Sequence, residues 1–585
     1  MILAWAISWR FMSHDYELRQ LIFLHIKANE LYGDQMRLKK KYYDGKYANF
    51  GLVMSENGDW KNAELLQFQV MVMRKKLLGS EHPDTLNSTG NPASTYRDQG
   101  RWNEAEQLQV QVMDMSKKLL GPEHPDSLNS MGNLANTYRY QGKWNEAEQL
   151  EVQVMDMRKK LLGPEHPDTL TSMGNLANTY RYQGKWDEAE QFEVQVLDMR
   201  KKLLGPEHPD ILISMGNLAC TYSYQGKWNE AEQLEVQVME MSKKLLGPEH
   251  PDTLVSMGNL ASTYSDQGKW NEAEQLQVQV MDMRKKLFGP EHPDTLISMG
   301  SLASTYRYQG KWSEAEKLQV QVMGIRKKLL GPEHPSTLDS MGNLASTYRC
   351  QGRWNEAEQL GVQVMDMGRK LLGPEHPSIL ISMGNLASTY RYQGKWNDAE
   401  KLQVQVMGMR KKLLGPEHPD TLNSMGNLAR TYSDQGKWNE AEQLEVQVMD
   451  IRKKLLGPEH PDTLISMGNL ARTYSDQGKW NEAEQLEVQV MEMSKKLLGP
   501  EHPDTLNSMA NLASTYSDQG KWNEAEQLKV QVMDMRKKLL GPAHPDTLNS
   551  MSNLDDKVCT LSCICHFRMW FNRPSIQFWC QQNAN

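Results

Sequence analysis

One feature limits what this chain can fold into more than any other. A unit of about 42 residues recurs along the sequence without an insertion or deletion, marked by histidines from His82 to His544 and by tryptophans from Trp60 to Trp522. A fixed period of this length is typical of a solenoid, in which each unit buries its apolar face only against its neighbours. The sequence therefore predicts one continuous array instead of several globular domains.

Within one unit, two apolar stripes at helical spacing stand on either side of a glycine. In residues 126–162 the first stripe runs from Leu128 to Tyr138 and the second begins at Trp144, with Gly142 between them. Intervals of three and four residues place such side chains on one face of a helix. Each unit is therefore predicted to be a hairpin of two antiparallel helices.

The ends of these helices also have candidate signals. Asp126 or Ser127 is the expected N-cap of the first helix, because either side chain has an oxygen that can accept a free backbone N–H. Gly163 is the expected C-terminal stop of the second helix, and the prolines after it prevent the helix from continuing. We therefore expect an all-α protein, a right-handed α-solenoid (superhelix) of stacked antiparallel helical hairpins.

Composition narrows the class of partner. The chain has 66 Lys plus Arg against 74 Asp plus Glu, so no global field attracts it to nucleic acid or to an anionic membrane. Two cysteines in the array, Cys220 and Cys350, give no disulfide framework, which favours a reducing compartment. The apolar start of the chain is short for a signal peptide or a membrane span. These observations predict a cytoplasmic protein.

The packing positions of the unit resemble a known family. The positions that carry the resemblance are Leu134, Ala135, Tyr138, Gly142, Trp144 and Ala147. They resemble the tetratricopeptide repeat, and the long period with Leu-Gly-Pro-Glu-His-Pro-Asp between units is similar to the kinesin-light-chain type. The repeat arrays of fungal NB-ARC and NACHT proteins are similar as well. The resemblance implies a non-catalytic scaffold without a cofactor, which binds a protein or peptide in a concave groove lined by the first helix of each repeat.

Two other functions remain open at this point. The array resembles the ligand-sensing arm of a nucleotide-switch protein whose NTPase domain is missing here, and it also resembles a kinesin-light-chain-like cargo adaptor. No G-x-x-x-x-G-K-[ST] phosphate loop occurs in the sequence. No nucleophile and base stand out from the repeat, so we do not expect an enzyme. The sequence leaves the oligomeric state open.

The expected domain organisation has three parts. Residues 1–41 are predicted to be a helical cap or the remnant of an upstream domain. Residues 42–554 form the array, with one degenerate hairpin, eleven full ones and a final partial helix. Residues 555–585 are an irregular tail rich in cysteine and aromatic residues, either disordered or wrongly translated.

A polar stripe lies opposite the packing stripe of the first helix. Residues advance by about 100° along a helix, which places Asn129, Asn133, Asn136 and Tyr140 away from the buried set. This stripe differs between repeats, and either partner recognition or neutral drift at exposed positions explains the variation. We predict that it lines the groove. The candidate residues are Asn133, Asn175, Asn217, Asn259, Asn343, Asn385, Asn427, Asn469, Asn511, Arg139, Tyr140, Arg181, Tyr182, Tyr224, Tyr308, Arg391, Tyr392, Arg430, Asp434, Arg472, Asp476 and Asp518.

The asparagines of this stripe recur in almost every repeat. An amide offers both a donor and an acceptor, so a ladder of amides can hold the backbone of an extended peptide. The alternative is that each amide ties its helix to a neighbouring helix. The stripe also predicts two halves, aromatic and basic around Arg139 and Tyr140, and acidic at Asp434, Asp476 and Asp518. The arginines at 430 and 472 pair with these aspartates only weakly if they are exposed.

Four further features have simpler interpretations. The repeated histidines are expected to be turn residues, because one per repeat is too widely spaced to share a metal ion. The glycine of Met-Gly-Asn-Leu-Ala is expected to permit close approach of a helix or ligand. The row at Gln109, Glu151 and their equivalents is expected on the exposed face of the second helix. Pro92 is expected to kink or partly melt its helix.

Overall fold

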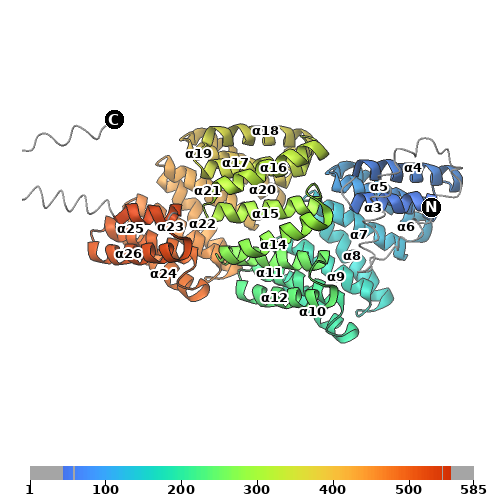
Figure 1. Ribbon diagram of the computed structural model, residues 1–585, viewed down its shortest axis with the longest axis horizontal. Coiled ribbons are helices and arrows are strands. Elements are labelled where there is room, and N and C mark those ends of the chain that lie inside the picture. Colours follow the sequence, from blue (N-terminus) through green and yellow to red (C-terminus); the bar gives the residue numbers. More distant parts are fainter. Residues whose placement is uncertain (1–43, 57–59, 543, 555–585) are drawn as a thin grey trace, which may run out of the picture. The chain divides into compact units, whose positions relative to one another are not determined.

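The computed structural model describes residues 44–56, 60–542 and 544–554 (Figure 1). Every bounded element in these ranges is a helix, and first helices alternate with longer second helices. The chain divides into two compact units, one that ends at Thr431 and one that begins at Tyr432. The bounds are α3 (Asp44–Glu56), α4 (Trp60–Leu78), α5 (Pro83–Asp98), α6 (Trp102–Leu120), α7 (Pro125–Tyr140), α8 (Trp144–Leu162), α9 (Pro167–Tyr182), α10 (Trp186–Leu204), α11 (Pro209–Tyr224), α12 (Trp228–Leu246), α13 (Pro251–Asp266), α14 (Trp270–Phe288), α15 (Pro293–Tyr308), α16 (Trp312–Leu330), α17 (Pro335–Cys350), α18 (Trp354–Leu372), α19 (Pro377–Tyr392), α20 (Trp396–Leu414), α21 (Pro419–Asp434), α22 (Trp438–Leu456), α23 (Pro461–Asp476), α24 (Trp480–Leu498), α25 (Pro503–Asp518) and α26 (Trp522–Leu540).

Within each unit, a hairpin packs mainly on the hairpins before and after it. In the first unit α7 contacts both α6 and α8, and the pattern repeats along the stack. The core of one layer consists of Leu128, Met131 and Val154, with Met113 and Leu150 against them. Equivalent residues form the other layers, as in Leu254, Met257 and Val280. The prediction of an all-α solenoid of stacked hairpins is confirmed. The outer segments 1–41 and 555–585 lie outside the described residues, and the final partial helix is present over 545–554.

From α5 onward the first helices have a histidine as N-cap instead of the predicted Asp126 or Ser127. His124 is the N-cap, and its Nδ1 accepts a hydrogen bond from the backbone N–H of Asp126 at 3.1 Å. Pro125 occupies the first helical position, where no backbone N–H is needed. The prediction for this cap is therefore wrong. The free N–H of Asp126 is already bound by Nδ1 of His124, the residue before the proline. The predicted stop is confirmed, since Gly163 caps α8 with a φ of 91°.

Pro92 does not interrupt α5, which runs from Pro83 to Asp98. Ala93 and Thr95 beyond the proline are buried, and the Thr95 hydroxyl donates to Gln67 Oε1 of α4 at 2.7 Å. Packing on both sides of the proline offsets the one backbone hydrogen bond that it cannot make. The predicted melting of this helix is wrong.

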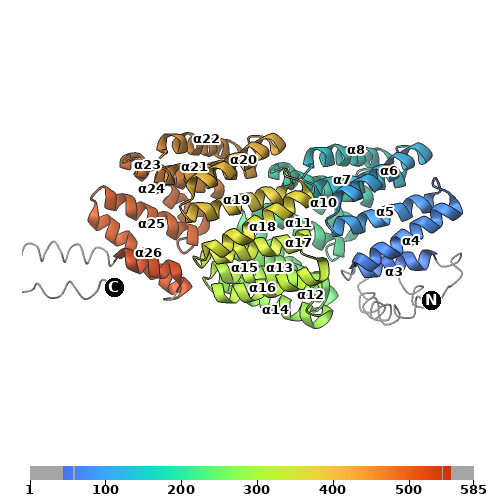
Figure 2. The ribbon, with the colours of Figure 1, turned by 90° about the horizontal axis from the view of Figure 1, so that it is seen from above.

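The stack curves with the first helices on its inner side. In the first unit the first helices of successive hairpins contact one another directly, as in α9 with α11, α11 with α13 and α17 with α19. Contacts between successive second helices are less extensive in the part of the chain that the structure describes. The closer row of a curved stack lies on its concave side, and Figure 2 allows the two rows to be followed.

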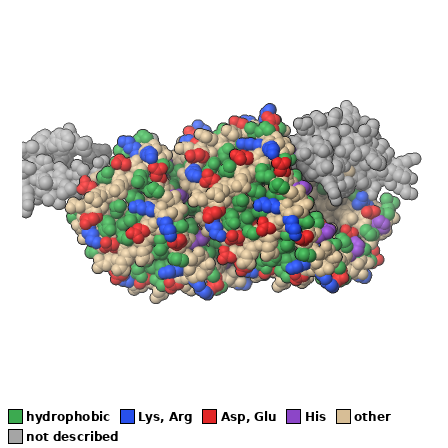
Figure 3. Space-filling model, turned by 90° about the horizontal axis from the view of Figure 1, so that it is seen from below, with side chains coloured by type: hydrophobic (Ala, Val, Ile, Leu, Met, Phe, Trp, Pro, Cys, Tyr) green, Lys and Arg blue, Asp and Glu red, His purple; other side chains and the backbone are tan. Residues whose placement is uncertain are grey.

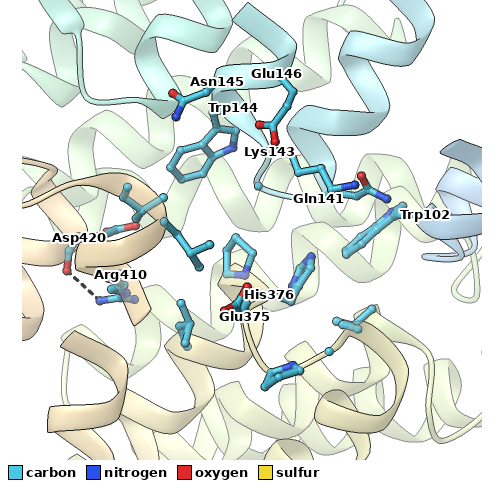
Figure 4. Close-up of a pocket in the computed structure, with 18 of the residues that line it drawn as sticks. Trp102, Gln141, Lys143, Trp144, Asn145, Glu146, Glu375, His376, Arg410 and Asp420 are labelled. Atoms are coloured by element: carbon cyan, nitrogen blue, oxygen red, sulfur yellow. Dashed lines mark hydrogen bonds between the residues drawn. The ribbon is translucent and has the colours of Figure 1, made fainter. Parts of the chain in front are cut away.

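The first unit also contacts itself after one superhelical turn, along a line that we call the seam. Trp102, at the start of α6, stacks on His376, with ring centroids 4.5 Å apart and planes 20° from parallel. Trp144 stacks on His418 in the same way at 5.3 Å. A cleft of about 810 Å³ runs along this contact, and Figure 4 shows Trp102, Trp144 and His376 facing it.

Candidate peptide-binding groove

The predicted polar stripe faces the inner side of the stack. On α11 the residues Ile213, Gly216 and Asn217 are spaced by three and four, so they share one face. Leu218 and Ala219, on the opposite face, are buried between hairpins. The inner face therefore presents three parallel rows: apolar residues equivalent to Ile213, glycines equivalent to Gly216 and amides equivalent to Asn217.

The glycine row borders open space. A Cβ atom placed on Gly132, Gly174, Gly216 or Gly258 would have no neighbouring atom within 4 Å. The expectation of close approach by a neighbouring helix is therefore wrong for these residues. The missing side chains lower the floor of the groove beside the amides.

The amide row lies open on the same face. The side chains are exposed or half-buried at every predicted position. Eight of these amides make no hydrogen bond within the described residues: Asn133, Asn175, Asn217, Asn259, Asn343, Asn385, Asn427 and Asn511. The alternative in which the amide ties two helices together has no contact to support it at these eight positions.

A small pocket opens between two of these amides. It has a volume of about 120 Å³ and lies between α9 and α11, with α10 at its base. Asn175 and Asn217 line it together with Ile213, Thr171 and the buried Glu193. This volume is on the order of one amino-acid side chain, since a water molecule occupies about 30 Å³.

The apolar row was not predicted from the sequence, because the polar Asn129 was taken as typical of the position that Ile213 occupies in its repeat. Ile213 is 59% exposed, and Val255, Ile297 and Ile381 are exposed at equivalent positions in the first unit. A large exposed apolar side chain is informative where several lie in a row. Alignment of the repeats shows apolar residues at this position in several of them, so the row could have been predicted from the sequence.

The two predicted groove arginines at 139 and 181 point between hairpins instead of into the groove. Arg139 is only 16% exposed and lies 3.7 Å from the carboxylate of Glu151. Its guanidinium also donates to Asn136 Oδ1 at 2.6 Å and to the backbone carbonyl of Asn175 at 3.4 Å. Arg181 makes the equivalent contact with Glu193 at 3.4 Å. The prediction of a basic half of the groove is therefore wrong at these two positions.

The predicted tyrosines lie at the C-terminal ends of the first helices. Tyr140 packs its ring against Trp102 at 6.5 Å, and Tyr182 packs against Trp144 at 6.1 Å. Tyr224 and Tyr308 stack on Trp186 and Trp270 in the same way, and Arg391 lies over the ring of Tyr392. These rings are about half exposed, so they flank the seam as much as the groove.

The acidic end lies in the second unit. Burial raises the pKa of Asp476, the nearby Asp434 and Asp518 raise it further, and Arg472 lowers it. Asp476 is therefore close enough to Asp434 and to Asp518 for their carboxylates to repel it. Arg472 lies one helical turn before Asp476, as predicted for an intrahelical pair.

The row at Gln109 and Glu151 is buried, although it was expected on the exposed face of the second helix. Glu151 is 4% exposed, and Gln109, Glu193, Glu235 and Gln277 are buried as well. Burial raises the pKa of Glu151 to about 7, against the lowering effects of Thr179 and Arg139. The prediction was wrong because the second helix is covered by its own first helix and by the next one, so its buried face is wider than its apolar stripe.

Within the described ranges no three His, Cys, Asp or Glu side chains converge in a way that could hold a metal ion. No described helix is both long enough and apolar enough to cross a bilayer. Figure 3 shows basic, acidic and apolar side chains interspersed over the face in view.

Two models of the tetratricopeptide repeat match this chain. One matches residues 91–160, 236–286, 259–328, 302–370, 351–412 and 378–454. The other matches residues 46–84, 169–210, 211–252, 463–504 and 505–546, so together they cover most of the array. A search of curated proteins gives no match.

Solved structures of helical repeat proteins are similar over parts of the chain. The nearly identical TPR-like repeats of a kinesin light chain candidate from Podosopora anserina are 41% identical, covering 35% of this chain and 98% of that chain, with a TM-score of 0.31. BtubC (BKLC) from P. vanneervenii is 16% identical, covering 40% and 92%, with a TM-score of 0.32. A Rap protein in complex with competence and sporulation factor is 11% identical, covering 63% and 98%, with a TM-score of 0.44.

Proposed function

Because this chain belongs to the tetratricopeptide repeat proteins, we propose that it is a non-catalytic scaffold that binds an extended peptide segment of a protein partner along the amide row. The observation that carries the proposal is the group of eight amides named above, whose side chains make no hydrogen bond within the described residues. An unpaired amide can donate to one backbone carbonyl and accept from one backbone N–H without regard to the partner's side chains.

The first unit offers side-chain selectivity beside this backbone recognition. The pocket between Asn175 and Asn217 admits one small side chain. The exposed Ile213, Val255 and Ile297 form an apolar border on the other side of the glycine row. A peptide with apolar side chains at intervals along an extended backbone fits these contacts best.

The test compares two triple variants of the full chain. Asn175, Asn217 and Asn259 are replaced by alanine in one, and the exposed amides Gln149, Gln191 and Gln233 of the second helices are replaced by alanine in the other. Peptides are selected from a random dodecapeptide display library on the unaltered protein, and their Kd values are measured by fluorescence anisotropy.

We expect the asparagine variant to bind the selected peptides at least tenfold more weakly, about 1.4 kcal/mol, and the glutamine variant to bind them unchanged. The thermal midpoint of both variants stays near that of the unaltered protein, since the replaced side chains make no hydrogen bond within the described residues. Equal affinity of the asparagine variant and the unaltered protein contradicts the proposal, as does a large fall in its Tm.

The narrower alternatives rest on the resemblance alone. A sensor arm of an NB-ARC or NACHT nucleotide switch is supported if genomic sequence upstream encodes a phosphate loop in the same reading frame. A kinesin-light-chain-like cargo adaptor is supported if the protein co-purifies with a motor heavy chain. Neither alternative changes the surface that contacts the peptide.

A further inference from the structure

The seam contacts follow one geometric rule in the first unit. Trp60, Trp102 and Trp144 stack on His334, His376 and His418, with centroid distances of 5.6, 4.5 and 5.3 Å. The interval is constant because the repeats contain no insertion or deletion, so each seam contact is a copy of the one before it.

Two of the seam histidines, His376 and His418, each make two different hydrogen bonds. His376 Nδ1 accepts from the backbone N–H of Ser378 at 3.1 Å, which caps α19. A neutral imidazole that accepts at Nδ1 carries its proton on Nε2, and Nε2 of His376 donates to the backbone carbonyl of Tyr140 at 3.4 Å. His418 makes the same bond to Tyr182 at 3.1 Å. The histidine therefore joins a helix start to the end of a helix 236 residues earlier.

A glycine and a proline complete the contact. A Cβ atom on Gly142 would lie 2.5 Å from Pro377 Cγ, and one on Gly184 would lie 2.6 Å from Pro419 Cδ. Only glycine permits this approach, and its φ of 73° at Gly142 also favours glycine. The tryptophan edge of a hairpin is thus a formed socket for a His-Pro turn.

The same socket is empty at the other end of the first unit. Trp354 and Trp396 are 40% and 43% exposed and make no ring contact within the described residues. A Cβ atom on Gly352 or Gly394 would have nothing within 4 Å. The socket residues are therefore all present at these two hairpins, but no His-Pro turn among the described residues of the first unit contacts them.

The matching His-Pro turns are uncovered at the start of the unit. The side chains of His124 and His166 are 41% and 40% exposed, although they cap their helices as His376 does. Leu161 and Leu203, on the same edge, are exposed as well. One molecule therefore exposes both halves of the seam contact, the tryptophan socket and the His-Pro turn.

From these two edges we propose that the protein assembles head to tail, with the His124 and His166 turns of one molecule seated in the Trp354 and Trp396 sockets of the next. The occupant is a second copy because the free edges continue a contact that the chain already makes with itself. The two halves lie on different surfaces, so the contact is heterologous and each added molecule leaves one free edge of each kind. Such an assembly grows by addition instead of closing as a symmetric dimer. It is independent of peptide binding in the groove.

The test uses sedimentation velocity of the full chain over about a hundredfold range of concentration. One variant carries Trp354→Ala and Trp396→Ala, and a second carries His124→Asn and His166→Asn, where asparagine retains an N-cap oxygen and removes the ring. A matched control carries Gln149→Asn and Gln191→Asn, which alters exposed side chains of α8 and α10 that belong to neither edge.

We expect the weight-average sedimentation coefficient of the unaltered protein and of the control to rise with concentration. Each edge variant alone should remain monomeric, and an equimolar mixture of the two should form a dimer and nothing larger, because each supplies the edge that the other lacks. Circular dichroism confirms that the variants are folded, and the histidine variant stands as evidence even if the tryptophan variant unfolds. A concentration-independent coefficient for the unaltered protein overturns the proposal. Unchanged association of the histidine variant overturns it as well.

Discussion

The hairpins of α7 to α12 and those of α13 to α16 are nearly identical in sequence and packing, but one buried position differs consistently between them. Glu151, Glu193 and Glu235 occupy it in the earlier hairpins, whereas Gln277 and Gln319 occupy it in the later ones. All five side chains are buried between successive hairpins. The backbone therefore tolerates both residues, and the difference between the two regions is one of ionisation instead of shape.

Burial raises the pKa of the glutamates, whereas the glutamines have no ionisable group. The pKa of Glu235 is raised to about 7, chiefly by desolvation. A hydrogen bond from Thr263 lowers this pKa, and the nearby Asp266 and Glu232 raise it. The folded state binds more protons than the unfolded state between the ordinary glutamate pKa and about 7. Stability is therefore highest at acid pH, falls as the pH rises through this window, and is lowest above it. The glutamine hairpins should lack this dependence.

The largest expected effect comes from making the two regions alike. Replacement of Glu151, Glu193 and Glu235 by glutamine should stabilise the array at pH 8, because no carboxylate has to be desolvated. The gain should be on the order of 2 kcal/mol at Glu235 and less at the other two sites, which pair with Arg139 and Arg181. At pH 5 the gain should nearly vanish. Thermal unfolding at both pH values measures the difference in Tm, with the exposed Glu146→Gln as a control that changes little at either pH. Equal gains at pH 5 and pH 8 would show that packing, and not charge, separates the two regions.

A smaller effect should follow from the reverse change in the other region. Gln277→Glu introduces a carboxyl at a buried site and should destabilise the array by about 2 kcal/mol at pH 8, with little effect at pH 5. Gln275→Glu is the matched control, since Gln275 is exposed two residues earlier on the same helix. If the two variants have the same Tm at pH 8, the buried site does not penalise a charge and the comparison fails.

The smallest expected effect concerns the hydroxyl that faces the carboxyl. Thr263→Val removes a donor that lowers the pKa of Glu235, so it should cost about 1 kcal/mol at pH 8 and raise the midpoint of the pH dependence. Thr305→Val is the same change at the equivalent position of α15, the first helix after Gln277, and its cost should not depend on pH. The measurement is Tm against pH for the two variants. Parallel curves for both would contradict the distinction between the regions.

The sequence was sufficient to predict the hairpins, because the spacing of three and four residues in the stripe that includes Leu128 and Leu134 depends only on local helix geometry. It was not sufficient for Glu151. A column that changes among Glu, Gln, Gly and Lys resembles an exposed position, and its burial follows from contact with two first helices at once. The capping role of His124 was missed for a different reason, since aspartate nearby is the commoner cap. The pairing of Trp102 with His376 has no local pattern at all, because it depends on how many hairpins complete one turn.

The constant spacing of the seam has a consequence for how such a gene can change. Recombination can add or remove one whole unit. The hairpins that pair along the seam are then still the same number of units apart, so each tryptophan equivalent to Trp102 still stacks on a histidine equivalent to His376. A deletion of a single codon shifts every later unit relative to the earlier turn and disrupts many contacts together. Selection on this contact alone therefore favours change in whole units, and the near-identity of the repeats gives recombination the matching sequences that it needs.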